Sequence, residues 1–563
     1  MKNLPYLEVI IKLWKINKVY VILLLIGKLK DVPFPMLSAL YTKYLIDSLV
    51  SNKSLLKVFY LLSLFLVFEF LLHLFDSWFN IKYESKKKEI ISKTLISEFF
   101  EQNINIQLKH FESTEFCNKN ALAVNELIPT YFNIFSCFVD ALVNLLTMLS
   151  LITVIFIVDK VIIISSILVL TLYFIINNKS NKIKIAHTKQ IIPIERFKRY
   201  LANLLTTYEN IKNIRVHYAE KFFINKWMEN IDKSISVINR FSNKLMVYSN
   251  LSYSIFSLFQ YSITMYTAYI VWIGKISIGS FSGITQSIFS FMNQLRRLSE
   301  TLVLLNNHSN LYRIIKELNL YVDDNSNIKK QKVLDKTKMH SIEFKNLDFS
   351  YGKNSDQKIL NDISFKINPG EKIAIIGDNA SGKSTLVNLL LRLYEPPDNT
   401  IFIDGVDVKK FSLQSIRENF SVIQQNSNNY ALTVAENITF STDLNLDESK
   451  INDSLKLSCL YEKICLQDKG IFSTLTKSFL NDGLSLSGGE SQKLNISRFF
   501  NKNSPILILD EYERWLDRTS SEIILKNIID FSKNKTLIII SHNEKFLSLM
   551  DKVVILKNGS IES

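Results

Sequence analysis

Cysteine is scarce in this chain, and its spacing excludes two common uses of the residue. Four cysteines occur in 563 residues, at Cys117, Cys137, Cys459 and Cys465, and no two of them form a CxxC pair. The last two fall in a segment that we expect to be cytosolic, where thiols stay reduced. We therefore predict neither a disulfide nor a cysteine metal site. A short apolar stretch followed by small residues is also missing at the start, so no cleavable signal peptide is expected.

Acidic residues are in the minority. The sequence has 53 Asp and Glu against 67 Lys and Arg, which gives a formal net charge of +14. A basic balance can indicate nucleic-acid binding, but here the lysines flank long apolar runs. Lys12, Lys15 and Lys18 precede the first run, and 86–88 follow the second. We therefore expect membrane lipid as a partner, and no nucleic acid.

The apolar runs are long enough to cross a membrane, which takes about 20 mostly apolar residues. Residues 5–16 are predicted to form an amphipathic helix on the inner membrane surface, and Pro33 and Pro35 are predicted to kink the first span. The six predicted spans are 18–48, 55–80, 131–157, 161–178, 245–273 and 284–308.

Two polar connectors with helical periodicity, at about 81–130 and 179–244, separate the second span from the third and the fourth from the fifth. We predict that they are helices extended beyond the bilayer, each pair joined by a short turn. The segments expected outside, such as 51–54 and 274–283, carry little charge. This asymmetry predicts a multi-pass plasma-membrane protein with the N-terminus and the C-terminal part in the cytoplasm. The abundance of Lys, Asn and Ile suggests an AT-rich genome, and we expect a bacterial source.

One segment carries a specific chemistry. Gly377 and the run Gly382-Lys383-Ser384 fit the phosphate-loop pattern, between a strand-like run at 372–376 and a helix-like run at 386–391. Backbone N–H groups at a helix N-terminus cradle phosphates, Lys383 can reach the β- and γ-phosphates, and Ser384 can bind Mg²⁺. The predicted phosphate-binding residues are Gly377, Asp378, Asn379, Ala380, Ser381, Gly382, Lys383, Ser384 and Thr385.

The motifs from Tyr351 onward resemble the nucleotide-binding domain of ATP-binding cassette (ABC) transporters, over essentially all of 341–563. The resemblance rests on the phosphate loop, on the run 486–490 (Leu-Ser-Gly-Gly-Glu), and on Asp510-Glu511 after the apolar run 506–509. It implies an α/β P-loop NTPase domain that hydrolyses ATP with Mg²⁺.

The resemblance also implies a role for each motif residue. Glu511 would polarise the attacking water, with Gln425 and His542 completing the catalytic set, and Tyr351 would stack on adenine. Gln424 is adjacent, but the spacing to the run 433–438 favours Gln425. The residues implied to bind Mg²⁺ are Ser384, Gln425 and Asp510. The further residues implied to bind ATP are Ser487, Gly488, Gly489 and Asp517. Of these, the signature residues Ser487, Gly488 and Gly489 would contact ATP that the opposite subunit holds.

Two departures from the family pattern stand out. Glu490 replaces a neutral glutamine at the end of the signature run, for which we expect a tuning effect and not a loss of activity. After Glu511 the family has small residues, whereas this chain has Tyr512-Glu513-Arg514-Trp515 before Leu516 and Asp517. These bulky residues bear on how two nucleotide domains pack together.

The whole chain resembles an exporter-type ABC half-transporter. We expect an all-α six-span domain at 1–315, a linker at 316–340 and the nucleotide-binding domain at 341–563. The runs 111–116 and 209–215, at the distal turns of the connectors, resemble coupling helices. The resemblance implies a homodimer with two composite ATP sites, and a heterodimer is the alternative.

Charged residues inside the predicted spans are costly, and they face a cavity or one another. If the first two spans form a hairpin, Lys28 lies level with Asp76, and Asp31 lies level with His73. Both readings stay open: internal ion pairs, or a polar cavity for cargo. The candidate residues are Lys28, Lys30, Asp31, Glu69, His73, Asp76, Asn293, Arg296 and Arg297.

We therefore expect ATP-driven export. The style of the run 212–220 resembles bacteriocin and lantibiotic exporters, which implies a modified antimicrobial peptide as cargo. A multidrug or lipid exporter, with an amphipathic small molecule as cargo, is the alternative. A regulatory protein that binds ATP without transport is the alternative of another class.

Overall fold

The structure is a computed structural model that describes residues 4–51, 55–156, 160–321, 332–351, 358–425, 428–442, 446–476, 483–541 and 548–562. The chain divides into two compact units. The helical unit is Met1–Ile104 with Asn118–Leu320, and the α/β unit is Tyr321–Ser563 with Asn105–Cys117. The distal turn of the first connector thus belongs to the α/β unit. His110 and Phe116 in that turn pack edge-on against the Tyr321 ring, with centroid distances of 4.9 and 5.2 Å.

The helical unit begins with the predicted amphipathic helix and a broken first span. Asn17 separates the first two helices and accepts a hydrogen bond from the Tyr20 N–H at 3.0 Å. The predicted kink is a full interruption, because the second helix ends at Leu29 and Pro33 caps the next one. The elements up to the first connector are α1 (Pro5–Ile16), α2 (Lys18–Leu29), α3 (Phe34–Val50), α4 (Leu55–Ser77), a π-helix (Trp78–Glu84) and α5 (Ser85–Ile104).

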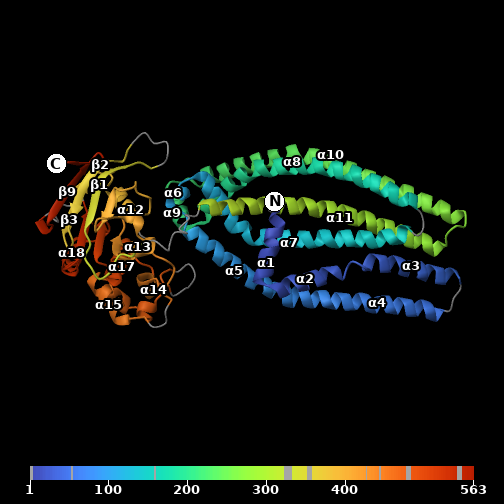
Figure 1. The fold of residues 1–563 in the computed structure, drawn as a ribbon, viewed down its shortest axis with the longest axis horizontal. Coiled ribbons are helices and arrows are strands. Elements are labelled where there is room, and N and C mark those ends of the chain that lie inside the picture. Colours follow the sequence, from blue (N-terminus) through green and yellow to red (C-terminus); the bar gives the residue numbers. More distant parts are fainter. Residues whose placement is uncertain are drawn as a thin grey trace. The chain divides into compact units, whose positions relative to one another are not determined.

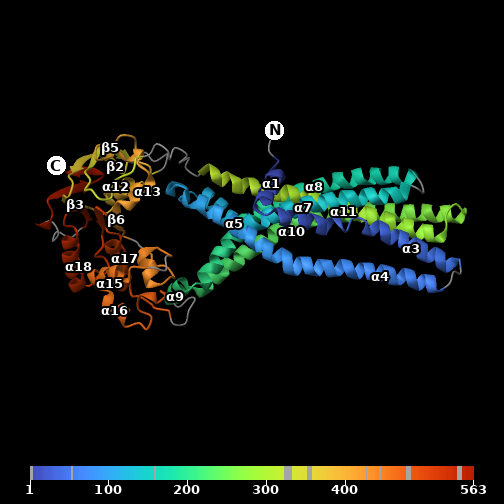
Figure 2. The same ribbon diagram turned by 60° about the horizontal axis from the view of Figure 1, so that its bottom comes forward.

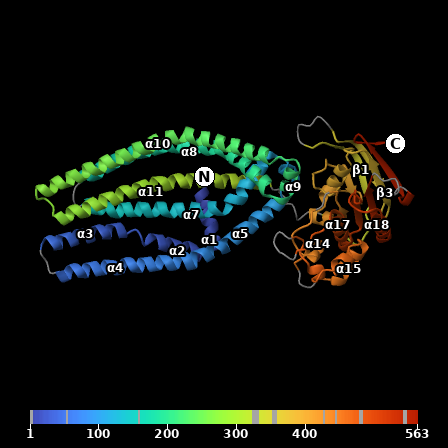
Figure 3. The ribbon, with the colours of Figure 1, turned by 180° about the vertical axis from the view of Figure 1, so that it is seen from behind.

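The polar connectors continue the apolar helices without a break, as their periodicity predicts. Figures 1 and 3 show α8 and α10 side by side over most of their length. Prolines at 129 and 193 lie inside two of these helices. The remaining helices of this unit are α7 (Thr114–Phe156), α8 (Lys160–Thr206), α9 (Tyr208–Val216), α10 (Glu220–Trp272), α11 (Ile278–Glu317) and a 3₁₀ turn (Leu318–Tyr321).

Two glycines bring α11 close to α3 (Figure 2). A Cβ atom on Gly279 would lie 2.4 Å from the Lys43 carbonyl oxygen, and one on Gly283 would lie 2.8 Å from the Ala39 oxygen. The Gly279 N–H donates to the Asp47 carboxylate at 3.1 Å. Small residues let helices approach closely where lipid gives no hydrophobic drive to associate.

Among the described residues, two helical stretches are both long and apolar enough to cross a membrane, Val58–Ile104 and Thr114–Thr153. The helices that follow alternate apolar and polar stretches. The total of six spans stays a prediction.

The α/β unit contains two sheets. The four-stranded sheet has the order β2-β1-β4-β5 and is antiparallel, and the six-stranded sheet has the order β10-β9-β3-β8-β7-β6. In the second sheet β9, β3, β8, β7 and β6 are parallel, and β10 is antiparallel to β9. The strands are β1 (Ile342–Phe349), β2 (Leu360–Ile367), β3 (Lys372–Gly377), β4 (Ile401–Ile403), β5 (Val406–Asp407), β6 (Phe420–Ile423), β7 (Ile506–Asp510), β8 (Thr536–Ile540), β9 (Lys552–Lys557) and β10 (Ser560–Glu562).

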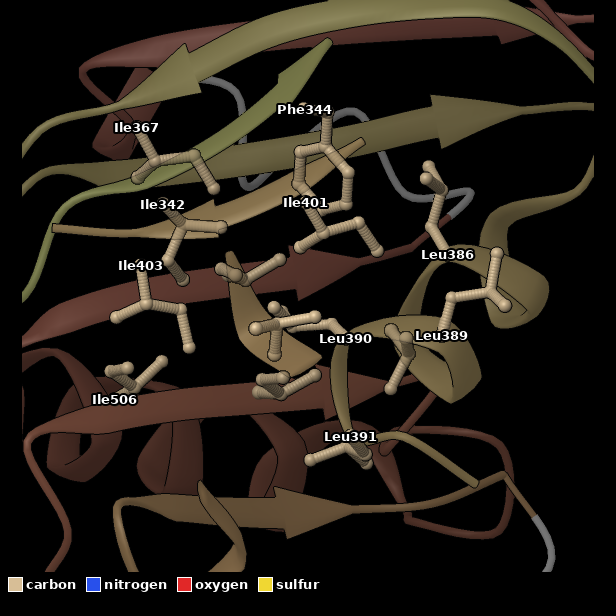
Figure 4. Packing of buried hydrophobic residues seen from close by; sticks show 14 of the residues in the cluster. Ile342, Phe344, Ile367, Leu386, Leu389, Leu390, Leu391, Ile401, Ile403 and Ile506 are labelled. Atoms are coloured by element: carbon tan, nitrogen blue, oxygen red, sulfur yellow. The ribbon is translucent and has the colours of Figure 1, made fainter. Parts of the chain in front are cut away.

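Buried leucines of α12 fill the space between the two sheets. Figure 4 shows Leu386, Leu389 and Leu390 pointing among isoleucines of both sheets, and all three are at most 1% exposed. This packing fixes the start of α12, which follows the phosphate loop. The helices of this unit are α6 (Leu108–Phe111), α12 (Lys383–Leu390), α13 (Leu413–Glu418), α14 (Val434–Thr439), α15 (Glu448–Leu457), α16 (Tyr461–Cys465), α17 (Gly488–Lys502) and α18 (Arg518–Phe531).

The charges of the first two spans do form ion pairs, but in a register that differs from the predicted one. Asp76 pairs with Lys30 at 2.5 Å, and Lys28 pairs with Asp140 of α7 at 3.1 Å. Asp31 lies 3.8 Å from Lys30 and is not paired with His73 among the described residues. The predicted pairs were wrong because the break after Leu29 shifts the register, and because a hairpin argument ignores the third helix.

We predict that Lys30 and Asp76 are energetically coupled. In a double-mutant cycle with Lys30→Met and Asp76→Asn, thermal unfolding of the purified chain should give a coupling free energy of about 1 kcal/mol. The value stays modest because the Asp76 side chain is 45% exposed. Lys28→Met with Asp76→Asn is the control cycle and should couple more weakly. A stronger coupling in the control cycle would restore the hairpin register.

Candidate functional site

The phosphate loop runs from β3 to α12 and is pressed against two other strands. A Cβ atom on Gly377 would lie 2.0 Å from the Leu556 carbonyl oxygen of β9, and one on Gly382 would lie 2.5 Å from the Leu360 side chain of β2. Gly382 also has a φ of 102°, which a side chain would strain. These approaches explain why glycines occupy both ends of the loop.

Lys383 is the first residue of α12, and its side chain crosses the loop. Its Nζ donates to the carbonyl oxygens of Gly377 and Asp378, both at 2.7 Å, and the residue is 6% exposed. Burial lowers the pKa of the Lys383 ammonium, while the carboxylates of Glu511 and Asp510 oppose that shift. The arrangement presents a desolvated cation beside the backbone N–H groups that open α12, as an anionic phosphate requires.

The residues proposed to hold Mg²⁺ meet beside this lysine. The Ser384 hydroxyl donates to Asp510 Oδ2 at 3.0 Å, while Asp510 Oδ1 is buried and has no hydrogen-bond partner among the described residues. Burial raises the pKa of the Asp510 carboxyl, with the Glu511 charge acting in the same direction. An orphaned carboxylate oxygen next to a hydroxyl suits a hard cation that prefers oxygen ligands, so the residues fit Mg²⁺.

Glu511 follows Asp510 directly and is held by the predicted glutamine. The Gln425 side-chain amide donates to Glu511 Oε2 at 2.5 Å, so Gln425, and not Gln424, reaches the site. Glu511 has a φ of 45°, a left-handed backbone that is uncommon for a non-glycine residue. Its N–H donates to the Ile540 carbonyl at 3.0 Å, which ties this conformation to the next strand. Backbone strain of this kind clusters at functional sites.

Tyr351 lies at the other side of α12. Its hydroxyl donates to Thr385 Oγ1 at 3.2 Å, and its ring packs edge-on against Tyr394, with the centroids 4.8 Å apart. The Tyr394 hydroxyl in turn donates to the carboxylate of Glu112, in the distal turn of the first connector. Burial raises the pKa of the Tyr394 hydroxyl, and its hydrogen bond to Glu112 raises it further. Tyr394 thus connects the nucleotide site to a segment that resembles a coupling helix.

The signature run begins α17. Ser487 caps the helix, and Glu490 completes a capping box: its carboxylate accepts from the Ser487 N–H at 2.8 Å, while the Ser487 hydroxyl accepts from the Glu490 N–H at 3.3 Å. Lys463 lies 3.3 Å from the Glu490 carboxylate. The Ser487 N–H bond holds the pKa of the Glu490 carboxyl below its usual range. The carboxylate is therefore engaged within its own chain, which gives the departure at this position a structural reason.

The bulky run after Glu511 divides between the core and the surface. Tyr512 is fully buried, and its carbonyl accepts from the Gln492 amide at 2.9 Å. Trp515 is 60% exposed, and its carbonyl would lie 2.9 Å from a Cβ atom on Gly489. Asp517 caps α18 by accepting from the Ser520 N–H at 2.9 Å. Trp515 therefore lies beside the signature glycines, while Tyr512 anchors the segment.

His542 lies outside the described residues. Sequence reasoning missed Tyr394 and Lys463 as site components, whereas Trp515 was already singled out as a bulky departure from the family pattern. For Tyr394 the sequence offers no signal, since an aromatic residue after a helix is unremarkable without the fold. For Lys463 the sequence did offer a signal, because the acidic Glu490 in place of a neutral residue predicts a basic side chain nearby.

The charged residues of the predicted spans separate into two groups. Lys28, Asp31 and Asp76 line a cavity of about 370 Å³ between α2, α4 and α7. Asn293 and Arg296 line a different cavity, of about 710 Å³, between α8, α10 and α11. The side chains of Glu69, His73 and Arg297 are exposed and line neither of the two.

Comparisons with known proteins agree with this geometry. Residues 360–513 match the family model described as ABC transporter. A solved structure described as a bacterial Atm1-family ABC exporter with ATP bound is similar over 96% of this chain and 93% of that chain, with a TM-score of 0.80 and 21% sequence identity. The chain therefore has the fold of an exporter-type ABC half-transporter, with an ABC transporter ATPase domain at its C-terminal end.

Curated relatives match over shorter stretches. An ATP-dependent lipid A-core flippase of Saccharophagus degradans is 37% identical over 183 residues, which is 32% of this chain and 30% of the flippase. An iron-sulfur clusters transporter, mitochondrial atm1 of Neurospora crassa, is 30% identical over 323 residues, which is 55% of this chain and 43% of the relative. The matches thus span 30% of the flippase and 43% of the transporter, so this chain covers less than half the length of each of these two relatives.

We predict that Glu490→Gln is nearly neutral. A glutamine keeps the acceptor of the capping box, so the free energy of unfolding should change by less than about 0.5 kcal/mol, whereas Glu490→Ala should cost about 1 kcal/mol. Because the pKa is lowered, the carboxylate's contribution is present at neutral pH and is lost as the pH falls through that pKa. Thermal unfolding and ATPase rates of both variants check this. A large ATPase loss in Glu490→Gln alone would mean that the carboxylate acts on the nucleotide.

Proposed function

We propose that this chain is the subunit of an ATP-driven membrane exporter. The observation that carries the proposal is the convergence of Lys383, Ser384, Asp510, Glu511 and Gln425 in one site. They supply a cation, a metal-binding pair, a candidate base and its positioning partner. The fold of the whole chain supports coupling of this site to a helical membrane domain.

Each residue has a distinct part in hydrolysis. The backbone N–H groups before α12 and the Lys383 ammonium bind the β- and γ-phosphates. Ser384 and Asp510 would hold Mg²⁺, which neutralises phosphate charge when bound. Glu511 orients the attacking water and draws its proton, while the Gln425 amide positions the Glu511 carboxylate.

Glu112, Tyr394 and Tyr351 form a contact path from the first connector to α12. If adenine stacks on Tyr351, as the family resemblance implies, the bound nucleotide would act on this path through the Tyr351 ring. Tyr394 is then a positioning residue that transmits the movement to Glu112. We propose that this path contributes to coupling between hydrolysis and transport.

Two copies of the chain complete the ATP site in this proposal. The signature helix α17 presents Ser487 and the Gly488 and Gly489 N–H groups, and a helix N-terminus with free N–H groups attracts phosphate. We assign that phosphate to ATP bound by a second copy. The exposed Trp515 beside these glycines would lie at the same interface.

For the cargo, the relatives favour the lipid alternative over the antimicrobial peptide. The names of these relatives refer to a lipid A-core flippase and to an iron-sulfur clusters transporter. Those alignments cover about a third to a half of this chain, so they support the class of machine more strongly than its cargo. We propose an amphipathic lipid-like cargo.

Glu511→Gln should abolish turnover while ATP binding persists. The amide cannot accept the proton of the attacking water, whereas Lys383 and Asp510 still hold the nucleotide. The loss in kcat should be about 10²-fold or more, measured as phosphate release, with nucleotide affinity measured separately. Lys383→Ala is the control that should lose affinity. Near-normal turnover in Glu511→Gln would remove Glu511 from the catalytic role.

Mixing two defective subunits tests the composite site. In a mixed dimer of Lys383→Ala and Ser487→Arg subunits, one ATP site carries both lesions and the other carries neither. ATPase activity should therefore reappear on mixing, to at most about half of the wild-type rate per dimer because one of two sites is intact. Crosslinking two copies under ATP is the accompanying measurement. No recovery, together with no crosslinked homodimer, would point to a heterologous partner chain.

A further inference from the structure

The cavity between α8, α10 and α11 combines features that the nucleotide site does not explain. Its volume of about 710 Å³ lies within the range of small-molecule sites, about 300–1,000 Å³. In Figures 1 and 3 α8 and α10 lie side by side, and α11 approaches them toward the end of the helical unit where α10 leads into α11. The lining is sharply divided between hydroxyl and amide groups, aromatic rings, and three charged side chains.

The polar lining follows one face of each helix. On α8 the lining positions Tyr173, Asn177, Ser180 and Lys184 recur at helical spacing, so they share a face. The α10 face adds Ser242, Ser249, Ser252, Ser257 and Gln260. Hydroxyl and amide groups can donate and accept hydrogen bonds, which lipid tails cannot satisfy. A continuous stripe of such groups on long helices therefore suits a polar ligand better than it suits lipid.

The three charged side chains of this cavity, those of Lys184, Arg296 and Glu300, are exposed. Arg296 and Glu300 stand one turn apart on α11, yet among the described residues neither side chain has an ion-pair or hydrogen-bond partner, and the same holds for Lys184. The charged residues of the other cavity behave differently, since Lys28 and Asp76 are both paired. Arg296 and Glu300 fall in the predicted span 284–308, and Lys184 lies just beyond the predicted span 161–178; a charge inside a span that has no protein partner is a candidate for ligand contact.

We propose that this cavity binds an amphiphile with an anionic headgroup, which is the cargo of the exporter. The cavity has two cationic side chains, Lys184 and Arg296, against one anionic side chain, Glu300. Serine hydroxyls such as those of Ser249 and Ser252 can donate hydrogen bonds to a phosphate or carboxylate, whereas the Asn177 amide already donates to Ser299 at 2.6 Å. Tyr253, Phe256 and Phe289 supply the apolar wall for the hydrocarbon part. The inference rests on the proposed export function and adds the cargo class and its site.

The direct test is a binding measurement on the full chain without nucleotide. The purified protein in a neutral detergent is titrated with lysophosphatidic acid and with monoacylglycerol of the same chain length, and bound ligand is read by native mass spectrometry. Wild type should prefer the anionic lipid. Arg296→Gln should weaken lysophosphatidic acid binding about tenfold, the value of one charge-assisted hydrogen bond. Glu300→Gln should strengthen it, because a like charge is removed.

Arg297 provides the matched control, since it is the neighbouring arginine and does not line the cavity. Arg297→Gln should bind lysophosphatidic acid within about twofold of wild type, and Arg296→Lys should recover most of the lost affinity, which excludes misfolding as the cause. Equal losses in the Arg296→Gln and Arg297→Gln variants, or no loss in Arg296→Gln, would overturn the site.

The two proposals fail in distinguishable ways. ATP hydrolysis without headgroup preference would reject the cavity and leave the exporter intact. If the chain binds lysophosphatidic acid selectively but does not hydrolyse ATP, the proposed export function is rejected and the proposed lipid site in the cavity stands. A preference for an amphipathic peptide over lysophosphatidic acid, lost in Arg296→Gln, would reject the lipid-like cargo.

Discussion

The close approach of the phosphate loop to its neighbouring strands is the constraint on which the nucleotide site depends. Gly377 lies against the backbone of β9 and Gly382 against a side chain of β2, so the loop is confined between the two sheets. The buried leucines of α12 hold the helix in the same layer (Figure 4). Because the loop cannot shift outward without opening the core, Lys383 and Ser384 meet Asp510 at fixed positions.

Burial then sets the electrostatics of this site. A desolvated lysine and a desolvated aspartate each lose hydration, which lowers the pKa of Lys383 and raises that of Asp510. The charge of each group opposes the pKa shift of the other, but in neither case does this attraction fully offset the effect of burial. A bound nucleoside triphosphate would supply an anionic partner for Lys383, and the proposed Mg²⁺ would supply a cationic partner for Asp510. The same imbalance that costs folding free energy therefore favours nucleotide binding, which is a general property of preorganised sites.

The sequence was sufficient for the α/β fold and for the pairing of helical connectors, because both rest on local signals. The strand, glycine loop and helix around Lys383 lie within one short stretch, and the periodicity of 179–244 persists through α8 and α10. The sequence was insufficient to predict contacts that depend on how distant helices align with one another. Lys30, and not Lys28, pairs with Asp76, because the chain breaks after Leu29 and a distant Asp140 competes for Lys28.

The site residues show the same division. Gln425 could be chosen over Gln424 from spacing, but its bond to Glu511 depends on strands that are 86 residues apart. Glu490 was visible as a substitution, yet only its packing shows that Lys463 and the Ser487 N–H absorb the charge. Composition identifies unusual residues, whereas only three-dimensional neighbours tell whether a residue is structurally satisfied.

That distinction separates structural charges from functional ones in the helical unit. The two charges of an ion pair inside a helix bundle neutralise each other, so the pair needs no ligand. Its main effect is to fix how the helices align, as the pair of Lys30 and Asp76 does. The exposed Arg296 guanidinium has no ion-pair partner among the described residues, so water or a ligand is left to accept its hydrogen bonds. Arg296 and Arg297 are adjacent in sequence and identical in chemistry, yet only Arg296 lines the cavity. Function in such a chain is therefore assigned by what remains unsatisfied after the fold has formed, and the charge count of a span says little about it.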